Sequence, residues 1–173
     1  SENLSLLLAK GGNWTGASDV LKLADYNSNP ELQKKRVYFM IESGHDLVDD
    51  PKLSMASIPS VLRLIDFYTK KNDEKRASEI IAKTWKQYQF LEMIKIFLKQ
   101  DKFNVKIALK RFKMVYNAIR HIDSDETKLA LATSALDAKL WGKTKFYLQS
   151  ISYNNIDKRV SDLWEKLSSS TDK

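Results

Sequence analysis

The stretch Leu4–Ala24, LSLLLAKGGNWTGASDVLKLA, decides the fold because a second stretch repeats its pattern near the other end of the chain. That second stretch is Leu131–Ile151, LATSALDAKLWGKTKFYLQSI, and a shift of 127 residues places Trp14 on Trp141. In both, apolar or small residues recur every three to four positions on each side of a short turn, which is the spacing of one helix face. Each stretch is therefore predicted to form two helices joined by a tight turn, and recurrence of this unit indicates a helical repeat array.

The residues that define this repeat are expected to lie in the core, between paired helices. They are Trp14, Ala17, Leu21, Ala77, Trp141, Thr144 and Leu148. A small side chain at the position of Ala17 lets two helix backbones approach closely in a densely packed interior. A middle copy at 61–84 fits this pattern less well, because Glu74 stands where the other two copies have tryptophan.

Composition favours helix throughout the chain. The 173 residues include only five Gly and three Pro, and they suit one domain with a substantial core. The expected helices span about 3–10, 14–26, 31–43, 51–57, 59–71, 74–87, 88–100, 103–121, 125–140, 142–152 and 156–168. We therefore predict an all-α fold of about nine to eleven helices, arranged as antiparallel helical hairpins in a right-handed α-solenoid.

The pattern resembles the tetratricopeptide repeat, about 34 residues of two antiparallel helices. Leu7–Leu21, Ala77–Trp85 and Leu129–Tyr147 further resemble the C-terminal soluble part of HemY-type proteins, above all through Leu-Trp-Gly-Lys at the turn of the last stretch. The chain departs from that family in its lysine richness and at 88–90, Tyr-Gln-Phe, where the family has a turn containing His-Pro.

This resemblance implies a setting for the protein. It implies a tetratricopeptide-like domain, residues 1–173, excised from a larger bacterial protein. That protein would be associated with the inner membrane through an N-terminal anchor that this chain does not include. The family is encoded near haem-synthesis functions, and the resemblance does not define its molecular role. The cytoplasmic side of the membrane is favoured for this domain.

Positive charge is concentrated in one part of the chain. The formal net charge is +7, and residues 83–121 hold ten basic residues against only Glu92 and Asp101. At helical spacing, four of these basic residues form what we call the basic stripe: Lys102, Lys106, Lys110 and Lys113. The opposite face is expected to be apolar and comprises Val105, Leu109, Phe112, Tyr116 and Ile119. Such a helix suits anionic lipid headgroups, phosphates or an acidic protein. The alternative is a solvated outer face.

Nucleic acid is a disfavoured partner, although an electrostatic footprint is present. Phe97, Phe103 and Phe112 interleave with the lysines, but each fits the apolar period of its helix and is expected in the core. No base-reading motif accompanies these residues.

Residues that could carry catalysis are scarce. His45 and His121 are far apart in sequence, and each is interpreted as a solvated or capping residue rather than a metal or haem ligand. Asp46, Asp49 and Asp50 are interpreted as cap and first-turn charges, and the pair Asp123 and Glu126 as a capping box. We therefore predict no catalytic residues, no metal site and no enzyme activity.

The preferred function is protein–protein interaction through the concave surface that stacked repeats create. The partner is unidentified, and the setting implied by the resemblance is a membrane-linked assembly connected with haem or porphyrin metabolism. No cofactor is expected. The alternative is direct binding of an anionic ligand, haem or porphyrin, or of an anionic membrane surface, through the basic helix at 102–120.

Overall fold

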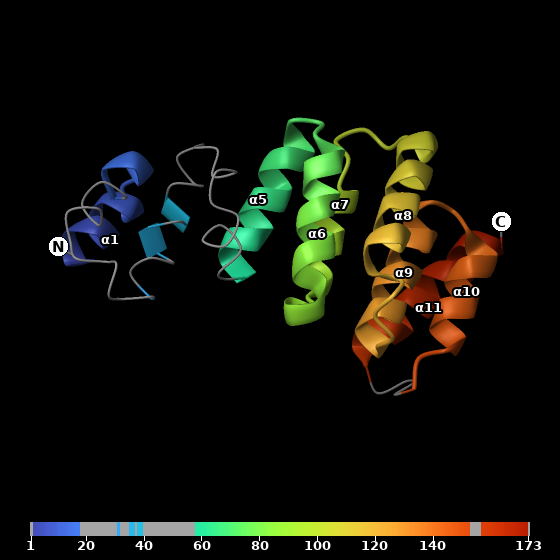
Figure 1. Cartoon of the computed structure of the whole chain (residues 1–173). Helices are drawn as coiled ribbons and strands as arrows, with labels where there is room; N and C mark the ends of the chain where they lie inside the picture. The colour runs from blue at the N-terminus through green and yellow to red at the C-terminus, as the bar shows by residue number, and fades with distance from the viewer. Residues whose placement is uncertain are drawn as a thin grey trace. The chain divides into compact units, whose positions relative to one another are not determined.

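The computed structural model describes residues 2–17, 31, 35–36, 38–39, 58–152 and 157–172. Within these ranges every regular element is a helix, so the predicted all-α class is confirmed (Figure 1). Eight helices have defined bounds, and residues 14–17 are also helical. Leu21, His45, the acidic group at 46–50 and most of the helices expected at 14–26, 31–43 and 51–57 lie outside the described residues.

The chain forms two compact units, residues 1–71 and 72–173. The interpretation of 1–173 as one domain stays a prediction, and each unit is described by itself below. The first unit contains helix α1, Glu2–Lys10, and helix α5, Ile58–Lys70.

Helix α1 ends in a Schellman motif, as the glycine pair predicts. The N–H of Gly12 donates to the Ala9 carbonyl (2.9 Å), and the N–H of Asn13 donates to the Leu8 carbonyl (2.8 Å). Gly12 has a φ of 79°, the left-handed conformation that this motif requires and that glycine adopts without strain. The turn places Trp14 directly after it.

Trp14 packs into a small core within the first unit. Its ring lies 5.9 Å from that of Phe39 and 6.2 Å from that of Tyr38, and the Tyr38 contact is edge-on. Ala9 and Ala17 are buried in the same cluster. Ala17 therefore lies in a buried cluster near this turn, and the Trp14 indole is partly buried against that cluster.

Helix α5 buries one face of regular helical period. Val61, Leu64, Ile65 and Tyr68 are all at most 4% exposed, and they follow the spacing i, i+3, i+4, i+7. All four residues fall within the middle copy of the repeat, 61–84.

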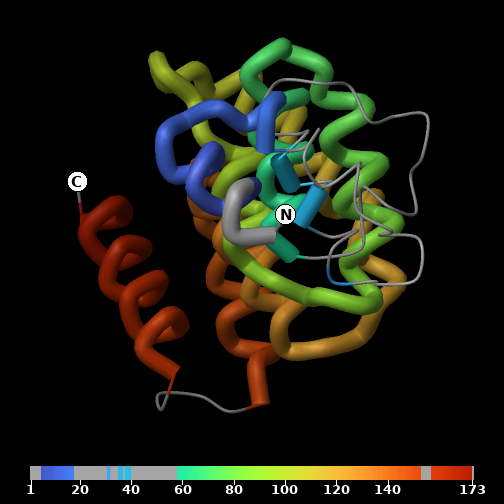
Figure 2. Tube along the Cα trace, turned by 90° about the vertical axis from the view of Figure 1, so that its left-hand side faces the viewer, coloured from blue at the N-terminus to red at the C-terminus, as the bar shows by residue number. Residues whose placement is uncertain are grey.

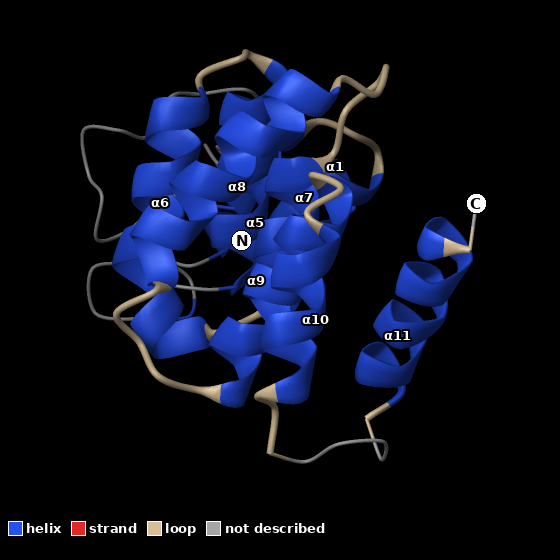
Figure 3. Ribbon diagram, turned by 90° about the vertical axis from the view of Figure 1, so that its right-hand side faces the viewer, coloured by secondary structure: helices blue, strands red, loops and turns tan. Residues whose placement is uncertain are grey.

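The second unit contains six helices joined by short connections, and its path can be followed in Figures 2 and 3. They are α6, Glu74–Tyr88; α7, Leu91–Leu98; α8, Val105–Ile119; α9, Asp125–Asp137; α10, Trp141–Gln149; and α11, Lys158–Thr171. Each helix packs against the next, and α7 also packs on α9, and α9 on α11. These contacts make α7, α9 and α11 one layer, which we call the inner layer. Helices α6, α8 and α10 form the outer layer, with α6 against α8.

The repeat is visible in the backbone conformation of its turns. Asn72 and Lys139 have φ values of 58° and 57°, and they occupy the position of Gly12 in the other two copies. After Lys139 the hydrogen bonds repeat those of the first turn, since the N–H of Leu140 donates to the Ala135 carbonyl (2.8 Å). Asparagine tolerates this conformation, whereas lysine adopts it at a cost. The position within the repeat, rather than the residue type, therefore determines which residue adopts the left-handed conformation.

One helix boundary and one cap differ from the predictions. The helix expected at 88–100 begins at Leu91, because Gln89 has a φ of 36° and ends α6. The predicted capping box of Asp123 and Glu126 is wrong: Ser124 is the N-cap of α9, and its hydroxyl accepts from the N–H of Thr127 (3.1 Å). Serine is a preferred N-cap residue, because its hydroxyl accepts a hydrogen bond from a free backbone N–H of the first helical turn.

A buried polar chain ties α6 to the start of α9. The indole Nε1 of Trp85, a side chain with no exposed surface, donates to the Thr127 hydroxyl (2.8 Å). That hydroxyl is also hydrogen-bonded to Ser124, whose own hydroxyl donates to Gln89 (2.6 Å). Buried hydrogen-bond donors are almost always paired. These hydrogen bonds satisfy the indole N–H of Trp85, the largest fully buried side chain among the described residues.

Candidate functional site

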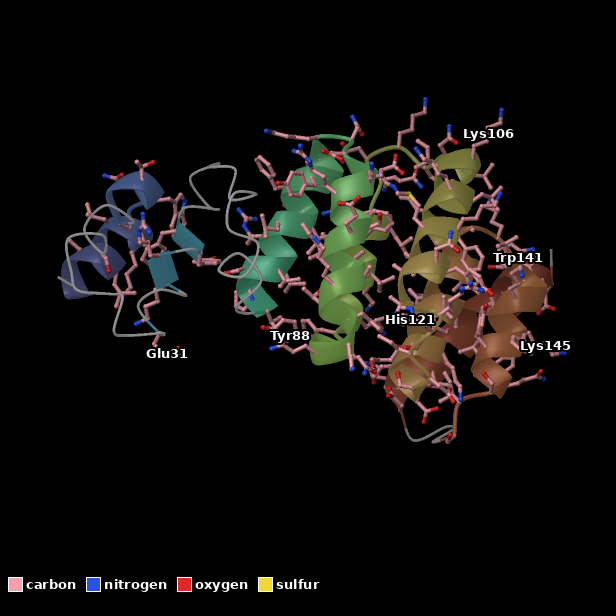
Figure 4. The ribbon with its side chains drawn as sticks, viewed as in Figure 1. Glu31, Tyr88, Lys106, His121, Trp141 and Lys145 are labelled. Atoms are coloured by element: carbon pink, nitrogen blue, oxygen red, sulfur yellow. The ribbon has the colours of Figure 1, made fainter. Side chains whose placement is uncertain are left out.

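The basic stripe is exposed, as predicted. Lys106, Lys110 and Lys113 lie on one face of α8, and Lys106 points away from the neighbouring helices near the start of α8 (Figure 4). Lys102 is also exposed, but it precedes the N-cap Asn104. The prediction that all four lysines share one helix is therefore wrong for Lys102, because the helix starts after Asn104.

Most of the stripe's charge is not neutralised within the described part of the chain. Lys110 lies 3.7 Å from a carboxylate oxygen of Glu74 on α6, and its side chain is 65% exposed. Among the described residues, Lys102, Lys106 and Lys113 form no ion pair within 4.0 Å. An exposed pair such as that of Lys110 contributes little to stability.

The opposite face of α8 is apolar, with two departures from the prediction. Phe112 and Ile119 are buried, and Leu109 and Tyr116 are partly buried. Val105 is 41% exposed and is the first residue of α8 after the N-cap Asn104. Arg111 is only 4% exposed, and sequence reasoning missed it because it counted this residue with the surface charges.

Arg111 links three helices beneath the inner layer. Its Nη1 donates to the Lys99 carbonyl after α7 (2.8 Å), and its Nε lies 3.7 Å from Glu74 on α6. The guanidinium also lies 5.7 Å from the centre of the Phe97 ring. The sequence signal for the burial of Arg111 was its helical spacing from Ala108 and Val115, which lie on the same face of α8. A charged residue on such a buried face needs polar or charged partners within the protein.

The inner layer carries two adjoining cavities of about 730 Å³ and about 590 Å³. Both are lined by Phe103, Leu136, Asp137 and Lys166. The smaller one extends along the end of α7, and the larger one extends past Trp141 and along α11. We call the surface formed by the two cavities the inner groove. Figure 3 shows α7, α9 and α11, the helices that bear it.

An exposed aromatic residue marks the middle of the inner groove. Phe103 is 50% exposed, so the prediction that it lies in the core is wrong. It sits in the connection between α7 and α8, where no helical period applies, and the Lys139 ammonium lies 5.2 Å from its ring centre. Trp141 lines the larger cavity and is partly buried at the start of α10 (Figure 4).

Asp137 forms part of the floor shared by both cavities. Among the described residues its buried Oδ2 has no hydrogen-bond partner. Burial raises the pKa of this carboxyl above its ordinary value, and the positive charge of Arg111 opposes that rise.

The α11 wall of the inner groove is held by apolar and ionic contacts. Val160, Leu163 and Leu167 are buried along one face of α11. At its N-terminal end, Arg159 donates to Glu126 on α9 (2.7 Å) and to its own N-cap Asp157 (2.7 Å). The hydrogen bonds from Arg159 lower the pKa of the Asp157 carboxyl.

The remaining residues of the predicted repeat core lie inside the protein. Ala77 and Thr144 have no exposed surface, and Leu148 is 3% exposed. The Thr144 hydroxyl donates to the Leu140 carbonyl one turn earlier (3.0 Å), so its polar atom is satisfied within the helix. These residues pack the repeat and leave the inner groove to other side chains.

The described ranges contain no group of three or more metal-ligating side chains. His121 is exposed in the turn after α8. None of the helices in those ranges is long and apolar enough to cross a membrane. The inner groove offers apolar surface and separated charges, and both can bind a partner.

No protein-family model, no curated protein and no solved structure matches this chain.

Proposed function

We propose that this chain is a non-enzymatic helical-repeat scaffold that binds a protein partner in its inner groove. The observation that carries the proposal is Phe103, a half-exposed aromatic side chain at the middle of two adjoining cavities. Exposed aromatic residues surrounded by polar ones mark interaction sites, and such residues dominate binding energy where a partner covers them. Stacked repeats present a surface of this kind along their inner layer.

A matched pair of variants tests this proposal. Phe103→Ala removes the aromatic group from the inner groove, whereas Phe146→Ala removes an even more exposed ring, 66% exposed, on α10 outside it. Affinity purification with quantitative mass spectrometry compares the wild type with both variants. A partner retained by the wild type and by Phe146→Ala, but lost with Phe103→Ala, supports the proposal. Equal recovery of every partner with all three proteins contradicts it.

The resemblance to HemY-type proteins supports a setting for this scaffold. That setting is a bacterial inner-membrane assembly connected with haem or porphyrin metabolism, with an N-terminal anchor upstream of this chain. The test is the full-length reading frame. Spanning helices immediately upstream of Ser1 would support the anchored setting, and a start codon directly before Ser1 would contradict it.

A second candidate function uses the outer layer. Lys102, Lys106 and Lys113 are exposed and lack ion-pair partners among the described residues, which favours an anionic membrane surface or an anionic tetrapyrrole as ligand. Lys106→Glu combined with Lys113→Glu should abolish co-sedimentation with anionic vesicles, or the Soret change on haem titration, without unfolding the protein. Wild-type binding should also fall as salt rises above about 0.15 M. Absence of any wild-type binding at low salt contradicts this candidate.

A further inference from the structure

The two halves of the inner groove differ in charge. The half along α7 is lined by Lys95, Lys99 and Lys166, with Asp137 as its carboxylate. The half along α11 has more acidic than basic residues: Asp137, Asp162 and Glu165 against Lys139 and Lys166. The groove is therefore cationic at one end and acidic at the other.

These charges are available to a partner. Among the described residues, none forms an ion pair within 4.0 Å with Lys95, Lys99 or Glu165. The same holds for Asp162, although Lys166 follows it by one helical turn. Since no ion pair with a described residue neutralises these side chains, the balance of charge on the groove lining changes from basic to acidic along its length.

The middle of the inner groove is apolar and has an unsatisfied floor. Phe103 and Leu136 line both cavities, and Asp137 Oδ2 lies buried beneath them without a donor. An apolar side chain can cover the phenyl ring, and an N–H group beside it can approach the carboxyl group of Asp137, which lines both cavities. A polypeptide supplies both groups within one or two residues.

We propose that the inner groove binds an extended peptide segment with a fixed order of charges. An acidic residue lies over Lys95 and Lys99, an apolar residue packs on Phe103, and a basic residue lies beside Asp162 and Glu165. Complementary charges of this kind set the direction and specificity of binding. The inference rests on the proposed function, because it names the chemistry of the partner that the inner groove accepts.

The charge order disfavours the other ligands considered for this protein. An anionic tetrapyrrole, a lipid headgroup or a phosphate backbone would meet the α7 lysines favourably but would be repelled by Asp162 and Glu165.

The experiment begins with a random linear peptide library on phage, panned against the intact chain. Clones that still bind Phe103→Ala are removed by counter-selection. The peptides that remain are synthesised with a fluorescent label, and their affinities are measured by anisotropy. We expect them to carry an acidic and a basic residue on opposite sides of an apolar centre.

Charge reversal then tests the orientation. Lys95→Glu with Lys99→Glu should weaken binding of a selected peptide by about tenfold or more, and a peptide whose acid is replaced by lysine should recover the affinity. Asp162→Lys with Glu165→Lys should require the opposite replacement, of the peptide's base by glutamate. The control is Lys106→Glu with Lys113→Glu, which changes the net charge equally on the outer layer and should alter affinity by less than about twofold. Circular dichroism confirms that each variant is folded.

Each remaining outcome has a distinct meaning. Peptides that need Phe103 but show no charge order overturn this inference and leave the proposed function standing. Failure to select any peptide sensitive to Phe103→Ala counts against both. A concentration-dependent dimer of the wild type that Phe103→Ala dissociates shows that a second copy occupies the groove, and that result also overturns the inference.

Discussion

Replacing Thr127 by valine tests the buried link between α6 and α9. The two side chains have nearly the same shape, so the change removes one oxygen and leaves the packing intact. Trp85 has no exposed surface, and its Nε1 would lose the acceptor that now lies 2.8 Å away. A buried donor left without a partner costs about 1–3 kcal/mol. The other partner of that oxygen, Ser124, keeps its hydrogen bond to Gln89, so the cost falls on Trp85 alone.

The assay is a double-mutant cycle by urea unfolding. Trp85→Phe destabilises the protein by leaving a cavity, but in that background no indole donor remains to be orphaned. Thr127→Val should then cost close to nothing, which gives a coupling energy of about 1–3 kcal/mol between the two sites. Thr133→Val on the same helix is the control, because among the described residues that hydroxyl bonds only to the Leu129 carbonyl one turn earlier. The reasoning is refuted if the effects of the two substitutions add within about 0.3 kcal/mol.

Three further predictions concern stability. In thermal or urea unfolding, the Lys139→Gly variant should be more stable than the Lys139→Ala variant by about 1 kcal/mol. Both substitutions remove the contact with Phe103, but only glycine adopts the left-handed conformation without strain. Equal stabilities of the two variants would contradict the assignment of this turn. Ala17→Leu should cost about 1–3 kcal/mol by overpacking, since Ala17 has no exposed surface, and an unchanged urea midpoint would be inconsistent with that burial. Asp137→Asn should raise stability at pH 7, because burial raises the pKa of the carboxyl and the folded state therefore resists its ionisation. As the pH falls, the Asp137 carboxyl of the wild type takes up its proton in the folded state before it does so in the unfolded state. The stability gained by Asp137→Asn should therefore shrink as the pH approaches 3.8, the ordinary pKa of the group. A stability gain that does not change with pH would contradict the raised pKa.

The parts of the fold that repeat could be predicted from the sequence. The alignment of Trp14 with Trp141 placed two turns, and the backbone at Gly12 and Lys139 follows the same alignment. Residue type alone would have missed the second turn, since lysine is a poor candidate for a left-handed conformation. Comparing copies succeeded there because equivalent helix ends need equivalent hydrogen bonds.

The candidate site could not be predicted in the same way. Phe103 lies in a connection, where no period indicates whether a side chain points inward or outward, and its exposure depends on how α7, α9 and α11 are spaced. Arg111 is the opposite case. A basic residue in a lysine-rich segment is expected on the surface, but Arg111 is buried, as are its neighbours on the same helix face. Both errors come from contacts between helices that are distant in sequence.

The two candidate surfaces lie on different layers, and that separation makes them independently testable. The exposed lysines of α8 account for much of the positive excess and belong to the outer layer, whereas the inner groove contains both signs of charge. Between the layers, Arg111 is buried with Glu74 and beside Asp137, so its charge supports packing and is not presented to either surface. Changes at Lys106 and Lys113 should therefore alter binding to anionic vesicles or to an anionic tetrapyrrole and leave peptide binding unchanged. Phe103→Ala should do the reverse, and a variant that affects both would mean that one ligand spans the two layers.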